Sequence, residues 1–156
     1  MPLVICEMTN LTELDISLNC IKELPQEVKN LTKLKKLDWS ANQMLALPPE
    51  IGLLKNLESL NLFNNVINKI PAELTNLTNL KELEIGLYLD YIPHEILELR
   101  SLERLKIKFY FILKSVPENL TNLKNLKELD LKENEIDDNI IKQIREKLGK
   151  NTVIVR

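Results

Sequence analysis

The sequence predicts an α/β solenoid, a protein built as one stack of short repeated units. The first observation is a period, because the segment that begins at Leu34 recurs at Leu57, 23 residues later. The second is the frame inside each unit, in which apolar residues stand at the first, fourth and sixth positions. The third is a change near the C-terminus, where the frame gives way to apolar residues at helical spacing. A unit of this size cannot bury its apolar side chains alone, so the units must stack.

Six units follow one another without a linker. They begin at leucines that are 23, 23, 23, 22 and 24 residues apart, namely Leu11, Leu34, Leu57, Leu80, Leu102 and Leu126. The pattern predicts one domain over residues 1–156, with no separate catalytic domain. In each unit the apolar residues at the fourth and sixth positions alternate with a variable residue, as in a β-strand. We therefore expect these two residues to point inward and their neighbours to point outward.

The second half of each unit follows a turn. An asparagine comes after the strand in four units, at Asn19, Asn42, Asn65 and Asn134. A side-chain amide can both donate to and accept from backbone groups that a sharp turn leaves unpaired. Five units then contain an apolar residue followed by a proline, at Pro25, Pro48, Pro71, Pro93 and Pro117. Proline fixes its own φ and lacks a backbone donor, so the returning segment should be extended or a short 3₁₀-helix rather than a long helix.

This frame resembles the leucine-rich repeat family, in the form L-x-x-L-x-L-x-x-N-x-I-x-x-L-P-x-x-I-x-x-L-x-x-L, which is common in bacterial proteins and in Ras-binding scaffold proteins. The resemblance covers essentially the whole chain. It implies a curved parallel β-sheet on a concave face and loops or 3₁₀ turns on a convex face. It also implies a ladder of asparagine side chains that are hydrogen-bonded to buried backbone.

The C-terminal residues 137–156 predict a cap for the stack. Asp137 and Asp138 precede a run of apolar residues at helical spacing, and Gly149 lies just beyond it. An acidic N-cap and a glycine stop are typical of an amphipathic helix. Residues 152–155 can then add a last short strand.

The N-terminal residues 1–8 align with residues 24–31, so the chain begins halfway through a unit and has no polar cap. Solenoids usually need capping units at both ends. Two interpretations stay open. The chain is a piece of a longer array, or its uncovered first strand, around residues 12–18, pairs with a second copy to form a homodimer.

Charge and hydropathy argue against a nucleic acid and a membrane as partners. The chain has 21 basic and 23 acidic residues and a formal net charge of -2, whereas nucleic-acid-binding surfaces normally show a clear basic excess. No apolar run approaches the length that a bilayer requires, and the first residues lack the basic region of a secretory signal. We therefore expect neither a nucleic acid nor a membrane as partner, and a cytoplasmic rather than a secreted protein, although an earlier removal of a signal stays open.

Catalysis and cofactors are not predicted. With three glycines the chain has no Gly-rich phosphate loop, and His94, its one histidine, has no second ligand at metal-binding spacing. Cys6 and Cys20 are too few for a disulfide scaffold, so we interpret both as free thiols.

The outward strand positions give unit 5 a basic island. It consists of Arg104, Lys106 and Lys108, and it lies beside Glu84 and Asp130 in the neighbouring units. Opposite charges in adjacent strands can simply lower repulsion, a weak effect at exposed sites. The same charges can instead steer and orient a partner.

Units 4 and 5 also depart most from the repeat frame. Tyr88 and Tyr110 replace the asparagine, and Tyr91, Phe109 and Phe111 lie close to them in the sequence. One interpretation is that the two tyrosines stack and fill the space that an asparagine pair would occupy. The other is that some of these rings are exposed beside basic residues, which is typical of protein interfaces.

The sequence thus predicts a non-enzymatic protein–protein interaction module that binds a protein or peptide on its concave face. The ligand itself is not identified by the sequence. The predicted contact residues are Phe63, Glu84, Arg104, Lys106, Lys108 and Phe109. The alternatives are a structural segment of a larger multidomain signalling protein, and self-association through the N-terminal end.

Overall fold

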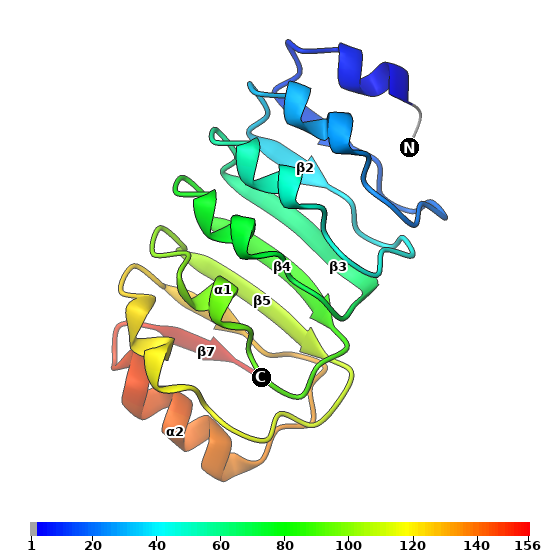
Figure 1. Ribbon diagram of the computed structural model, residues 1–156. Helices are drawn as coiled ribbons and strands as arrows, with labels where there is room; N and C mark the ends of the chain where they lie inside the picture. Colours follow the sequence, from blue (N-terminus) through cyan, green and yellow to red (C-terminus); the bar gives the residue numbers. More distant parts are fainter. Residues whose placement is uncertain (1–2) are drawn as a thin grey trace.

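The computed structural model describes residues 3–156. These residues form one parallel sheet of seven strands whose spatial order is their order in the sequence. The strands are β1 (Glu13–Asp15), β2 (Lys36–Asp38), β3 (Ser59–Ile67), β4 (Glu82–Leu87), β5 (Arg104–Phe109), β6 (Glu128–Asp130) and β7 (Val153–Val155). Figure 1 shows them side by side along a stack, with the returning segments packed against one face of the sheet. The predicted solenoid is confirmed.

Short helices form the returning face. The 3₁₀-helices are η1 (Leu3–Glu7), η2 (Gln26–Asn30), η3 (Pro49–Leu53), η4 (Ala72–Asn76) and η5 (Glu118–Asn122). Each of η2 to η5 begins directly after a proline whose φ lies between -68° and -77°, as the sequence predicts. Unit 4 differs, because one turn of α-helix, α1 (His94–Leu97), buries the two consecutive residues Ile96 and Leu97.

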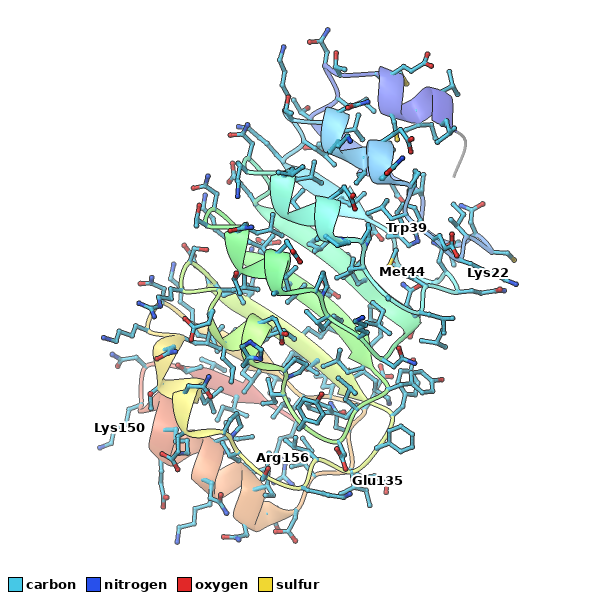
Figure 2. All side chains as sticks on the ribbon, viewed as in Figure 1. Lys22, Trp39, Met44, Glu135, Lys150 and Arg156 are labelled. Carbon is cyan, nitrogen blue, oxygen red and sulfur yellow. The ribbon has the colours of Figure 1, made fainter. Side chains whose placement is uncertain are left out.

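The core lies between the sheet and these short helices. The repeat leucines and isoleucines that define units 2 to 6 are buried there and form one continuous apolar cluster along the stack, and those of unit 1 are partly buried against it. Trp39 and Met44 are both fully buried in unit 2, and Figure 2 labels them in the N-terminal part of the stack. Stacking therefore supplies the burial that no single unit achieves alone.

The C-terminal cap has the predicted form. Helix α2 (Asp138–Leu148) begins after Asp137, whose side chain accepts a hydrogen bond from the Asn139 backbone N–H at 2.7 Å. Its apolar face is buried, the helix packs against η5 of unit 5, and the chain leaves the helix through Gly149 at a φ of 74°. Strand β7 then pairs with β6 and ends the sheet.

At the other end of the stack, η1 packs on η2, and β1 pairs only with β2 within residues 3–156. Met1 and Pro2, which belong to the predicted half unit, lie outside the described residues. Cys6 is buried and Cys20 is exposed, and both are free, as predicted. Self-association through β1 stays a prediction. Within residues 3–156, no helix is both long and apolar enough to cross a bilayer.

Candidate functional site

A left-handed turn ends the strand in units 1, 2 and 6 and interrupts β3 in unit 3. The turn residues have φ values between 51° and 61° and are Leu18, Ala41, Asn64 and Glu133. Three positions before each of them, an outward Asp or Asn accepts a hydrogen bond from the backbone N–H two residues further on. This local bond competes with strand pairing and favours the turn. In unit 3, where β3 resumes beyond the turn, the result is a bulge.

The asparagine that follows the turn points inward. The amide of Asn65, which is buried, accepts a hydrogen bond from the Met44 N–H at 2.9 Å and donates to carbonyls on two neighbouring units. Asn42 and Asn134 make the same kind of bridge, so the predicted ladder is present. Asn19 is exposed and bonds only within its own unit. The ladder thus satisfies backbone groups that would otherwise be buried unpaired.

Units 4 and 5 have neither the turn nor the ladder. Strands β4 and β5 instead run on, and the Tyr88 and Tyr110 N–H groups donate to the carbonyls of Ile67 and Leu87 at 2.8 Å and 3.0 Å. Because side chains alternate along a strand, Leu87 and Phe109 point into the core and the tyrosines point out. Phe109 is only 6% exposed. Phe109, which we predicted as a contact residue, is therefore almost wholly buried, because the longer strand places its side chain inside.

Three outward aromatic rings and one aliphatic side chain form a surface cluster that we call the aromatic ridge. It consists of Tyr88, Tyr110, Phe111 and Ile112. The two tyrosines stack with their centroids 4.2 Å apart, and Phe111 lies edge-on to Tyr88 at 6.2 Å. The exposed fractions are 36% and 38% for the tyrosines, 57% for Phe111 and 64% for Ile112. The predicted stacking is confirmed, but the rings lie on the surface, and Leu87 and Phe109 fill the interior.

Gly86 lets the ridge lie close to the sheet. A Cβ atom at this position would stand 3.2 Å from Cε2 of Tyr110, which is tighter than ordinary contact. Burial of the Tyr110 hydroxyl, together with the neighbouring Tyr88 and Glu133, raises its pKa. The ring therefore stays neutral and keeps its apolar character.

A hollow lies on each side of the ridge. The apolar hollow, between units 4 and 5, has a volume of about 630 Å³ and is lined by the ridge with Leu89, Asp90 and Lys114. The acidic hollow, between units 5 and 6, has a volume of about 310 Å³ and includes Lys108, Glu133 and Glu135 beside Tyr110, Phe111 and Ile112. Figure 2 shows Glu135 on the loop that joins β6 to α2.

The predicted basic island is present but paired. Arg104 forms an ion pair with Glu82, and Lys106 lies 3.3 Å from the carboxylate of Glu84. Lys108 donates to the Glu133 carbonyl and lies 3.5 Å from the Glu133 carboxylate. All three basic side chains thus have acidic partners. The charge pattern fits cross-strand neutralisation better than a free basic patch.

Three of the predicted contact residues meet on the outward face of the sheet. The Lys106 Nζ atom lies 4.2 Å from the centroid of the Phe63 ring, a cation–π contact that reaches from β5 to β3. Glu84, on the strand between them, pairs with the same ammonium group. Within residues 3–156, no group of His, Cys, Asp or Glu is arranged to hold a metal ion.

Ile112, Glu133 and Glu135, which line the hollows, are not among the predicted contact residues. The orientation of the tyrosines did not follow from the sequence either. A usable signal was present. Units 4 and 5 lack both the outward Asp or Asn and the ladder asparagine, having Glu84 and Lys106 at the first of these positions. Without both side chains the turn has no support, so the strand continues.

Comparisons with known proteins agree with this fold. A family model described as a leucine-rich repeat region matches residues 37–155, and a second, described as a leucine-rich repeat, matches residues 7–22. None of the curated proteins matches the chain.

Solved structures match more widely. A leucine-rich repeat protein of Leptospira interrogans is 34% identical over 100% of this chain and 40% of its own, with a TM-score of 0.88. An internalin of Listeria monocytogenes is 24% identical over 99% of this chain and 44% of its own, with a TM-score of 0.81. The plant peptide hormone receptor RGFR1, solved in complex with RGF2, is 28% identical over 87% of this chain and 23% of its own, with a TM-score of 0.69. This chain thus spans less than half the length of each. It belongs to the leucine-rich repeat family.

Proposed function

We propose that this protein is a recognition domain that binds a peptide segment, either free or exposed on a larger protein, with the aromatic ridge as its main contact. The observation that carries the proposal is the exposure of four large apolar side chains side by side on units 4 and 5. Tyr and Phe are the side chains that most often dominate interface energies. Because the tyrosines are stacked and held by backbone pairing, little ordering entropy is lost on binding.

The neighbouring sheet surface extends this contact. Phe63 and Lys106 lie on the same outward face of the sheet as Tyr110. Lys106 precedes Tyr110 by four residues, so the alternation of side chains along β5 points both outward. A partner that extends from the ridge along this face would also contact Phe63. The likeness to a plant receptor solved with RGF2 supports a peptide as the class of ligand.

Selection from a random peptide library displayed on phage tests the proposal. The affinity of selected peptides is then measured by calorimetry for the wild type and for two double variants. Phe111→Ser with Ile112→Ser removes the exposed half of the ridge. Leu18→Ser with Leu45→Ser is the matched control, because these exposed leucines lie on loops in units 1 and 2.

The expected result is a loss of affinity on the order of tenfold or more in the ridge variant and none in the control. Urea unfolding checks that both variants are folded. The proposal fails if no peptide binds the wild type above an unrelated protein, or if the ridge variant binds the selected peptides as well as the wild type does.

A further inference from the structure

We propose that the ridge selects an extended segment in which a large apolar residue and a lysine or arginine stand two residues apart. The inference rests on the proposed function and adds the chemistry of the partner. It follows from the difference between the two hollows that flank the ridge.

The apolar hollow offers nothing to a charged side chain. Its only two charged groups, Asp90 and Lys114, pair with each other at 2.5 Å. The hydrogen bond from Lys114 lowers the pKa of Asp90, so this carboxyl stays ionised near neutral pH. The remaining lining consists of the ridge and Leu89. Burying an apolar side chain there removes apolar surface from water without breaking a polar contact.

The acidic hollow has an excess of negative charge. Glu133 and Glu135 face one ammonium group, that of Lys108, which is mostly buried and is already bound to the Glu133 carbonyl. Glu135 has no ion pair within residues 3–156, and the Glu133 carboxylate is mostly exposed. A cationic side chain complements this charge.

Geometry fixes how the two side chains are spaced. The apolar hollow lies between units 4 and 5 and the acidic hollow between units 5 and 6, so they are separated by at least about one strand spacing, roughly 4.8 Å. An extended chain rises roughly 3.3 Å per residue, and its side chains alternate between two faces. A segment that runs along the stack therefore places an apolar and a basic side chain in the two hollows when they are two residues apart, roughly 6.6 Å along the segment.

The test uses the most enriched peptide from the library selection, synthesised with a fluorescein label. Anisotropy titrations compare this peptide with two variants, one with glutamate in place of its basic residue and one with serine in place of its apolar residue. The proteins are the wild type, Glu133→Gln with Glu135→Gln, and the control Glu23→Gln with Glu146→Gln. Each double variant removes two exposed carboxylates. In the described part of the chain Glu23, Glu135 and Glu146 have no ion pair, and Glu133 has only a weak one, with Lys108.

We expect enriched peptides to share an apolar residue two positions from a Lys or Arg. The glutamate peptide should bind the wild type roughly fivefold or more weakly, since each of the two rim charge pairs contributes roughly two- to fivefold. Glu133→Gln with Glu135→Gln should reduce that preference to about twofold or less, and the control should keep it. The preference should also shrink at high salt, because exposed charges are screened.

Three other results would each overturn the inference. If enriched peptides bind without a basic residue, the partner chemistry is wrong while the proposed function stands. If no peptide binds, the proposed function fails as well. If light scattering shows a dimer that Phe111→Ser with Ile112→Ser dissociates, a second copy of the chain occupies the ridge, which contradicts both proposals.

Discussion

Units 2 and 5 start from the same repeat frame and end their strands in opposite ways. In unit 2, Asp38 supports a left-handed turn at Ala41, and Asn42 enters the core. In unit 5, Lys106 stands where Asp38 does, the strand continues, and Tyr110 reaches the surface. These two side chains therefore distinguish the units that have the left-handed turn from those whose strand continues without it.

The difference teaches where such a scaffold has room for a binding surface. Buried backbone groups at the strand end must be paired, and the inward asparagine does this in most units. Where the asparagine is absent, backbone pairing between β3, β4 and β5 does it instead. That exchange frees the outward position for an aromatic side chain. Local departures from an otherwise regular pattern are expected at functional sites.

The largest expected effect separates Phe109 from Tyr110. Phe109→Ala should lower the free energy of unfolding by about 3 to 4 kcal/mol, because it opens a cavity in the core. Tyr110→Ala should cost about 1 kcal/mol, mainly from the lost ring stacking. Urea unfolding followed by circular dichroism measures both. Equal losses, or a larger loss at Tyr110, would show that the tyrosine is the buried ring.

The second effect tests the ladder that units 4 and 5 lack. Asn65→Ala should lower the free energy of unfolding by about 2 to 3 kcal/mol, since it leaves buried backbone groups of two units unpaired. Asn19→Ala is the control and should cost less than about 1 kcal/mol, because this amide is exposed. The same urea titrations apply, and a small loss at Asn65 would remove the proposed role of the ladder.

The third effect tests the support of the turn. Asp38→Ala should cost about 1 kcal/mol, because its carboxylate accepts from the Ser40 N–H at 2.8 Å and from the Asn61 side chain at 2.9 Å. Glu84→Ala should cost about 0.5 kcal/mol or less, since its exposed ion pair with Lys106 is weak. Thermal unfolding of the two variants in parallel gives the comparison. A larger loss for Glu84→Ala would show that unit 4 depends on that carboxylate for its shape.

The smallest expected effect is a dependence of Tm on pH, which comes from ion pairs between neighbouring units. Hydrogen bonds from Lys81, Lys114 and Lys127 lower the pKa values of Glu58, Asp90 and Glu103, respectively. Their stabilising contribution is complete above the unfolded pKa of about 4 and is lost as the pH falls through the lowered values. Tm should therefore decline modestly below pH 4, and less so at high salt. A Tm that rises on acidification would contradict these pairings.

The period predicted most of the fold. The inward pairs, the register of the outward columns and the C-terminal cap all follow from the spacing of apolar residues, because stacking leaves them one arrangement. Residue-by-residue alignment failed at Phe109, because it assumed that every unit makes the same turn. The sign of φ at one residue reverses which side chain is buried, and alignment does not contain φ.

The charged contact residues show a second limit. The sequence placed Glu84 beside Lys106 correctly, since strand register follows from the period. It did not show that Lys108 would turn to Glu133, a residue outside the strand columns. Long flexible side chains choose among several partners, and that choice depends on turn geometry that the period does not determine.

Backbone φ angles at six equivalent positions test the central claim most directly. Three-bond HN–Hα couplings and backbone chemical shifts measured by NMR report the sign of φ at each one. We predict positive φ at Leu18, Ala41, Asn64 and Glu133 and extended, negative φ at Leu87 and Phe109. Positive φ at Leu87 and Phe109, with Tyr88 and Tyr110 turned inward, would contradict the account, because the aromatic ridge would then not exist.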